Sequence, residues 1–130
     1  MKIYDKNDNL LAILIKANEI KIGRNFLTTN EEEMQVASFN FAEKTVIDNH
    51  IHLNQDRSIQ TTPEILFVVS GKLKVFIFDD HKDFVNEYNL ETGDTIALIK
   101  GGHGLEVEKG TKLVEAKQGP YTEILDKKRF

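Results

Sequence analysis

The feature that most constrains this sequence is a rhythm of short apolar segments separated by turn-forming residues. The segments expected as strands are residues 2–4, 10–15, 34–41, 45–52, 57–61, 64–69, 72–78, 84–90, 95–99, 103–107 and 112–117. Turn formers lie between them, for example in residues 5–9 (DKNDN) and 91–94 (ETGD). Short strands separated by such turns predict an all-β domain, built as a sandwich or a barrel.

Helical periodicity is weak throughout the chain. The best candidate for a helix is residues 29–36, which open with Thr29 and Asn30 and carry acidic residues in the first turn. The same residues could equally form a loop that enters a strand.

Two of the expected strands are apolar on both faces. In residues 72–78, Leu73, Val75 and Ile77 alternate with Phe76 and Phe78. Residues 64–69 show the same double pattern. A strand of this kind must bury both faces, so we expect the second face to meet the N-terminal strands or another subunit. A homodimer is therefore expected.

Length and composition narrow the classes of function. The 130 residues are the size of one domain and include no cysteine, which excludes disulfides, thiol catalysis and thiolate metal ligands. The net charge of −4 comes without a basic face, so we expect no nucleic acid as a partner. No apolar run approaches the ~20 residues that span a bilayer, and the N-terminus lacks the pattern of a signal peptide. We expect a cytoplasmic protein without a membrane partner.

Three histidines and one glutamate form a candidate metal site. His50 and His52 are two residues apart, so a strand would project both imidazoles from one face, although an isolated pair of this kind is usually solvated. Glu64 and His103 each begin an expected strand on its core-facing side. A carboxylate and an imidazole placed there need compensation, which a shared divalent cation would supply. Nitrogen and oxygen ligands suit Fe, Mn, Ni, Cu or Zn.

These residues carry a resemblance to the cupin superfamily. The first cupin motif contains His-x-His and then a glutamate followed by a glycine, as in His50, His52, Glu64 and Gly71. The second motif begins with Gly-Asp and runs through a glycine turn to a histidine, as residues 93–103 do. Eleven residues separate His52 from Glu64, more than is usual in that family. The resemblance implies that the three histidines and the glutamate hold a divalent metal.

The resemblance also implies a fold. It predicts one cupin-type antiparallel β-barrel, a jelly-roll sandwich, over residues 1–130. The N-terminal strands of residues 1–41 would pack on a barrel core of about residues 45–118, followed by a tail at residues 119–130. The strings around His50, Arg57 and Glu64, with residues 101–104 and 117–121, look like a family of small bacterial cupins associated with surface-polysaccharide gene neighbourhoods.

Three further residues are candidates for substrate binding. Arg57 and Lys117 could bind a phosphate or carboxylate, or could form ordinary ion pairs at strand ends. Tyr121 could act as a general acid, but it is more simply read as a residue that docks the tail. The basic cluster at residues 127–129 is expected to be a solvated tail.

The function expected from this site is that of a metal-dependent enzyme on a small polar substrate. A sugar or nucleotide sugar, isomerised or epimerised with Glu64 as the catalytic base, fits the polysaccharide-linked resemblance. An oxygenase would use the same ligands and consume oxygen when loaded with Fe(II). A non-catalytic ligand- or metal-binding cupin is the third possibility. The cofactor would be one divalent ion of Fe, Mn, Ni or Zn.

Overall fold

Antiparallel strands make up almost all of the regular structure. A computed structural model describes residues 1–121 and 127–130. Over these residues the elements are β1 (Lys2–Tyr4), β2 (Leu10–Ile15), the 3-10 turn η1 (Ala17–Glu19), β3 (Gly23–Phe26), β4 (Ala37–Asn40), β5 (Glu64–Ser70), β6 (Lys72–Phe78), β7 (Phe84–Glu91), β8 (Thr95–Leu98), β9 (Gly102–Val107) and β10 (Lys112–Lys117). The all-β class is confirmed. No helix in the described ranges is long and apolar enough to cross a membrane.

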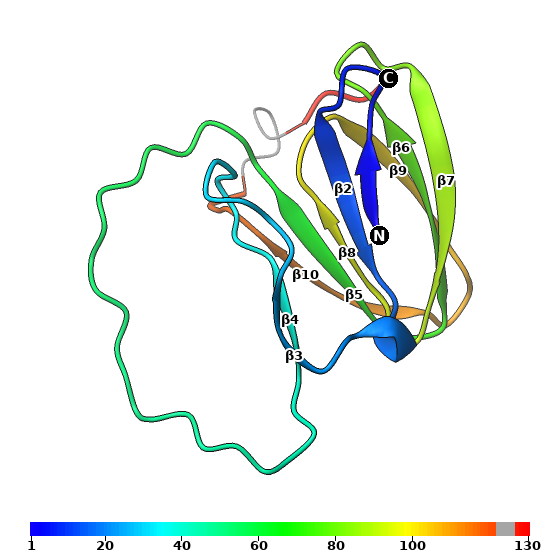
Figure 1. Ribbon diagram of the computed structural model, residues 1–130. Helices are drawn as coiled ribbons and strands as arrows, with labels where there is room; N and C mark the ends of the chain where they lie inside the picture. The colour runs from blue at the N-terminus through cyan, green and yellow to red at the C-terminus, as the bar shows by residue number, and fades with distance from the viewer. Residues whose placement is uncertain (122–126) are drawn as a thin grey trace.

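The strands form two facing sheets and a small third one (Figure 1). A five-stranded sheet has the order β1-β2-β8-β5-β10, and a three-stranded sheet has the order β7-β6-β9. Within the described residues, strands β3 and β4 pair only with each other, beside the five-stranded sheet. The N-terminal strands β1 and β2 are thus part of the main sandwich, because β2 pairs directly with β8.

The core lies between the two main sheets. Alternation in β6 turns Leu73, Val75 and Ile77 inward, where each is at most 1% exposed. They meet Leu66 and Val68 of β5 in one cluster of buried residues. The sequence predicts burial of both faces of these strands, and this first face is the fully buried one. Burying such aliphatic side chains is the main favourable contribution to folding.

A second apolar layer covers part of the outer face of the five-stranded sheet. Ile13, Ala97 and Ile99 pack there with Val36, and Ile65 of β5 joins them. The segment between β3 and β4 supplies Val36, so the second face of β5 does meet an N-terminal part of the chain. The cover is incomplete, because Phe67 and Val69 on the same face of β5 remain 39% and 43% exposed.

Residues 29–36 form turns and bends that lead into β4, so the alternative of a loop entering a strand holds and the helix does not form; the amide of Val36 donates to Thr28 Oγ1. Residues 45–52 and 57–61, expected as strands, are not strands in this structure. They belong to an exposed extended segment, residues 41–62, which we call the arm. A strand requires a neighbour for its backbone groups, and none of the described sheets supplies one here.

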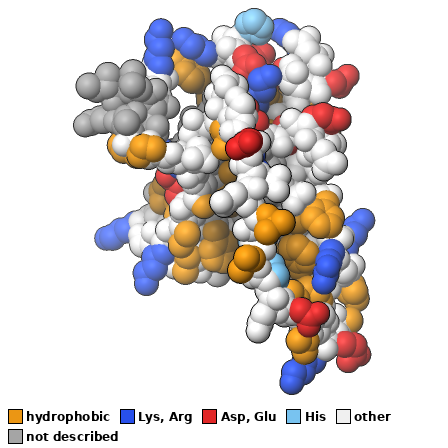
Figure 2. All heavy atoms as spheres, turned by 90° about the vertical axis from the view of Figure 1, so that its left-hand side faces the viewer, with side chains coloured by type: hydrophobic (Ala, Val, Ile, Leu, Met, Phe, Trp, Pro, Cys, Tyr) orange, Lys and Arg blue, Asp and Glu red, His pale blue; other side chains and the backbone are white. Residues whose placement is uncertain are grey.

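The arm leaves the body of the molecule between β4 and β5 (Figure 1). All of its residues are exposed, including Val46 at 80%, Ile51 at 83% and Leu53 at 74%. Near its end, Glu33 accepts hydrogen bonds from the backbone amides of Gln60 and Thr61. Figure 2 views this side and shows hydrophobic side chains gathered on its surface.

No strand pairing within the described residues joins the two main sheets, and core-facing residues are exposed on the side of β9 and β10. Among the described strands, β9 pairs only with β6 and β10 only with β5, so each has one free edge and no closed barrel forms. Inward-facing Leu105 and Val107 of β9 are therefore 42% and 50% exposed. This open side positions the candidate site.

Candidate functional site

Four ionisable side chains meet at the open side of the sandwich, and we call them the polar cluster: Glu64, His103, Glu115 and Lys117. Strand register explains why they converge. Lys117 of β10 lies directly opposite Glu64 of β5, and Glu115 projects from the same face two residues earlier. His103 lies opposite Ile77 of β6, so it faces inward from the other sheet.

The closest ion-pair contact in the polar cluster joins His103 and Glu64. His103 Nε2 lies 3.1 Å from Glu64 Oε2, and the side chains are 32% and 14% exposed. The hydrogen bond from His103 outweighs the effect of burial and lowers the pKa of Glu64 to about 2. Glu64 is therefore a carboxylate at neutral pH, held against the imidazole.

A second carboxyl group completes the acidic part of the cluster. The side chain of Glu115 hydrogen-bonds to Glu64, and this contact, together with burial, raises the pKa of Glu115. Lys117 Nζ, 3.8 Å from Glu115 Oε1, acts in the opposite direction. Two neighbouring carboxyl groups resist ionising together, so a shared proton belongs to Glu115 rather than to Glu64.

The polar cluster lines a cavity of about 860 Å³, a volume suited to a small organic ligand. Phe76 and Phe78 supply apolar surface, and the last four residues of the chain, 127–130, also line the cavity. The site therefore combines a hydrogen-bonded acid–base pair, an aromatic surface and a set of basic side chains.

The structure brings two of the four candidate metal ligands together and leaves the other two apart. Glu64 and His103 are in contact, whereas His50 and His52 lie on the arm with ring centroids 5.3 Å from each other. His50 Nδ1 lies 2.9 Å from the backbone oxygen of Asp48. Within the described part of the chain, no three His, Asp or Glu side chains are grouped to hold an ion. In this arrangement the four residues do not fit a single metal centre.

The candidate substrate-binding residues also separate. Lys117 lines the cavity, and its Nζ lies 4.8 Å from the centre of the Tyr121 ring. That contact fits Tyr121 as a residue that docks the start of the tail. Arg57 lies on the arm, where it borders a different hollow with residues 29–33.

Sequence reasoning missed Glu115 and the tail at residues 127–130. Glu115 could have been found, because it stands two residues before Lys117 in an expected strand and must share its face. The return of the tail to the cavity has no comparable local signal, since it depends on contacts between residues far apart in sequence.

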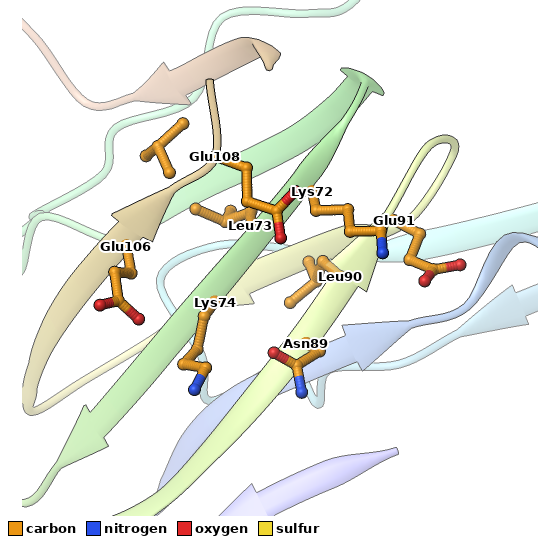
Figure 3. Close-up of a pocket in the computed structure, with 9 residues that line it drawn as sticks. Lys72, Leu73, Lys74, Asn89, Leu90, Glu91, Glu106 and Glu108 are labelled. Carbon is orange, nitrogen blue, oxygen red and sulfur yellow. The ribbon is translucent and has the colours of Figure 1, made fainter. Parts of the chain in front are cut away.

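A second cavity, of about 500 Å³, lies over the three-stranded sheet (Figure 3). Lys72, Lys74, Glu91, Glu106 and Glu108 border it from strands β6, β7 and β9 and the turn after β9. Lys74 Nζ lies 3.3 Å from Glu87 Oε1 in an exposed ion pair. Opposite charges that alternate across strands are typical of a solvated sheet face, so this cavity is the weaker candidate.

One comparison with known proteins identifies a family. Residues 10–90, which are 81 of the 130 residues, match the family described as a domain of unknown function (DUF6016), and the chain belongs to that family. The matched range contains His50, His52 and Glu64 and ends before His103. No curated protein and no solved structure matches the chain.

Proposed function

We propose that the protein is an enzyme that transfers a proton on a small polar substrate, in an isomerase or epimerase type of reaction. One observation carries this proposal: His103 and Glu64 are in hydrogen-bond contact at 3.1 Å and both line the 860 Å³ cavity. A carboxylate that holds one imidazole nitrogen fixes the tautomer and stabilises the imidazolium that forms when the other nitrogen accepts a proton.

The roles within the pair follow from this geometry. With Nε2 directed at Glu64, Nδ1 is the His103 nitrogen left to take a proton from a substrate carbon beside a carbonyl group. In isomerisation the resulting enediolate regains the proton at the neighbouring carbon while the hydroxyl proton passes to the former carbonyl oxygen. In epimerisation it regains the proton on the opposite face of the same carbon, so atoms and electrons balance without an oxidant. Glu64, expected from the sequence as the base, becomes the positioning residue. A sugar or nucleotide sugar has the required carbonyl and hydroxyl groups.

Hydrogen exchange tests the proposal directly. The protein is incubated in D₂O with a panel of sugars and nucleotide sugars, and deuterium at the carbon next to the carbonyl is followed by NMR. We expect exchange with the unmodified protein, a loss of at least about 100-fold in His103→Gln, and a smaller loss in Glu64→Gln. Exchange that survives unchanged in His103→Gln would contradict the proposal. Saturable binding with no exchange would favour the non-catalytic ligand-binding alternative.

We also propose that the chain closes into the cupin-type jelly-roll barrel when the arm pairs with a free strand edge. Two observations support closure: β9 has an unpaired edge beside exposed Leu105 and Val107, and the arm is extended with exposed apolar residues. Ten residues separate His52 from Pro63, enough chain to return from β9 to the start of β5. Burial of both apolar surfaces would favour the closed form.

Amide hydrogen exchange measured by NMR tests closure. In a closed barrel, the amides of β9 that point to its free edge donate to the arm and exchange slowly. Equally slow exchange is expected in β8, which is paired on both sides and serves as the internal control. Exchange of the β9 edge amides at the rate of an unstructured peptide, with β8 protected, would contradict closure.

A metal-dependent function is the second candidate, favoured by the arm because it carries both His50 and His52. Pairing of residues 45–52 with β9 would move these histidines to the strand that holds His103. Elemental analysis of untagged protein after reconstitution with Fe, Mn, Ni and Zn tests this prediction. We expect about one bound ion per chain, falling sharply in His50→Ala and His52→Ala. Less than about a tenth of an equivalent would remove the metal from the proposal.

A further inference from the structure

The end of the chain folds back onto the cavity through its last residue. The Phe130 ring contacts the Phe78 ring edge-on, with centroids 5.2 Å apart, and Lys82 Nζ lies 5.5 Å from the Phe130 ring centre. Glycine at position 102 makes this possible, since a Cβ there would lie only 2.8 Å from Phe130 Cζ. The tail thus contacts the start of β9 through Phe130, while this ring stays 61% exposed and residues 127–129 remain exposed to solvent, as expected from the sequence.

Docking of Phe130 places three consecutive cations at the cavity. Lys127, Lys128 and Arg129 all line it, and no ion pair joins any of them to another described residue. Lys127 Nζ lies 5.8 Å from the Tyr121 ring centre, and Lys117 Nζ lies 4.8 Å from the same centre. Two ammonium groups drawn to one ring repel each other, and an anion between them would relieve that repulsion.

Each acidic group of the cavity has a partner outside residues 127–129, and the charge of Lys127 additionally acts on Glu115. Asp80 Oδ2 lies 3.8 Å from Lys100 Nζ. Glu64 is held by His103, and Glu115 by Glu64. Asp79 Oδ1 accepts hydrogen bonds from the backbone amides of His81 and Asp83. The cavity thus combines a carboxylate–imidazole pair with three cationic side chains that no ion pair within the described residues neutralises.

We propose that residues 127–129 form an anion-binding wall of the cavity, and that its natural ligand carries a phosphate or diphosphate group. Phosphate oxygens accept charge-assisted hydrogen bonds from lysine and bidentate ones from arginine. The ligand's anionic group binds at the tail, and its uncharged part extends toward His103 and Glu64. This inference rests on the proposed function for the reacting end, but anion binding at the tail is measurable by itself.

Calorimetric titration with inorganic pyrophosphate tests the wall. The triple variant Lys127→Ala, Lys128→Ala, Arg129→Ala is compared with a control that replaces Lys2, Lys21 and Lys109 by alanine. Both triples change the net charge from −4 to −7, so general electrostatics affects them alike. We expect pyrophosphate to bind the unmodified protein and the control triple, and its dissociation constant to rise at least about ten-fold in the tail triple.

A matched pair of glycine variants tests the docked tail without removing any charge. Gly102→Ala places a methyl group against Phe130, whereas the same change at Gly104 on the same face of β9 meets Phe76 at an ordinary 3.7 Å. We expect Gly102→Ala to weaken pyrophosphate binding several-fold, and Gly104→Ala to leave it unchanged.

Three results would overturn the inference: no pyrophosphate binding by the unmodified protein, unchanged binding by the tail triple, or an equal loss in the control triple. A different set of results would show that the proposed function fails while the anion-binding wall stands. In that case His103→Gln and the unmodified protein both lack deuterium exchange on every sugar tested, while pyrophosphate binding still depends on residues 127–129. Uridine diphosphate and uridine, titrated in parallel, show whether the diphosphate alone accounts for the affinity or whether a nucleoside adds to it.

Discussion

Two clusters of charged side chains lie at different places in the sandwich, and they differ in how fully their hydrogen bonds are satisfied. Asp94 accepts hydrogen bonds from Lys16 Nζ at 2.7 Å and from the backbone amides of Ala17 and Glu91. Lys16 also donates to the backbone oxygen of Asn89 in β7, which joins the two main sheets. The Asp94 side chain is only 8% exposed.

The polar cluster around Glu64 is arranged differently. Its histidine is 32% exposed and borders a cavity, and its two carboxyl groups compete for one proton. The Asp94 cluster is enclosed, its hydrogen bonds are satisfied, and it connects the two main sheets. The Glu64 cluster instead has ionisable groups that face a cavity large enough for a small ligand. The comparison indicates that the first contributes to stability and the second to function, and substitutions at matched positions can test this.

The largest expected difference concerns two apolar residues that face the same core from the two edge strands of the three-stranded sheet. Leu90 is fully buried in β7, and Leu105 in β9 is 42% exposed although it faces the same core. We expect Leu90→Ala to lower the free energy of unfolding by about 3 kcal/mol, and Leu105→Ala by less than about 1 kcal/mol as long as the arm stays away from β9. Urea denaturation measures both. Equal losses would show that Leu105 is covered, as closure of the arm over β9 requires.

A smaller difference is expected between the two charged clusters. Asp94→Asn removes a charged acceptor of three hydrogen bonds, and we expect the free energy of unfolding to fall by about 2 kcal/mol. Glu64→Gln loses its charged contact with His103 but also relieves repulsion with Glu115, so a change under about 1 kcal/mol is expected. Denaturation at pH 7 measures both. A greater loss from Glu64→Gln would reverse the structural assignment.

The smallest effect is a difference in acid sensitivity. Burial opposes ionisation of Asp94, but Lys16 and the backbone amides outweigh it and hold its pKa below 3.8. A carboxyl group whose pKa is lower in the folded than in the unfolded state stabilises the fold above its unfolded pKa. This stabilisation is lost as pH falls through the folded pKa. At the open side, the lowered pKa of Glu64 and the raised pKa of Glu115 have opposite effects.

We therefore expect both Asp94→Asn and Glu64→Gln to reduce the loss of stability as pH falls from about 5 toward 2, with the raised pKa of Glu115 offsetting part of the effect of Glu64. Urea midpoints measured across this range give the slope for each variant, with the unmodified protein as reference. A slope that depends on Glu64 and not on Asp94 would mean that the open cluster controls the acid response.

Most strands could be predicted because burial of one face of a strand leaves an alternation of apolar residues in its sequence. The ranges of β1, β2, β6 and β10 agree with the expected segments, and each has apolar residues at positions that face the sandwich. Strand β3, Gly23–Phe26, was missed because its sequence GRNF has no apolar alternation and it pairs only with β4. Its formation depends on that partner and not on its own pattern.

The arm shows the limit of the same reasoning. Val46, Ile47 and Ile51 make residues 45–52 resemble a strand, yet pairing depends on a neighbour that may lie anywhere in the chain. The approach of Glu64 to His103 was predictable, because each begins a strand with its side chain toward the core. The docking of Phe130 at Gly102 was not, since the two residues lie on different segments with no shared pattern.

The exposed arm also has a consequence for how the chain can be divided. Residues 41–62 connect β4 to β5, but β2 on one side of this connection pairs with β8 on the other. Ile3 and Leu11 likewise share a core with Leu66 and Val75. A protease cut near residue 50 is therefore expected to leave two fragments that remain associated and that could be produced separately and recombined. The arm is thus a natural place to open the chain for circular permutation or for a split reporter.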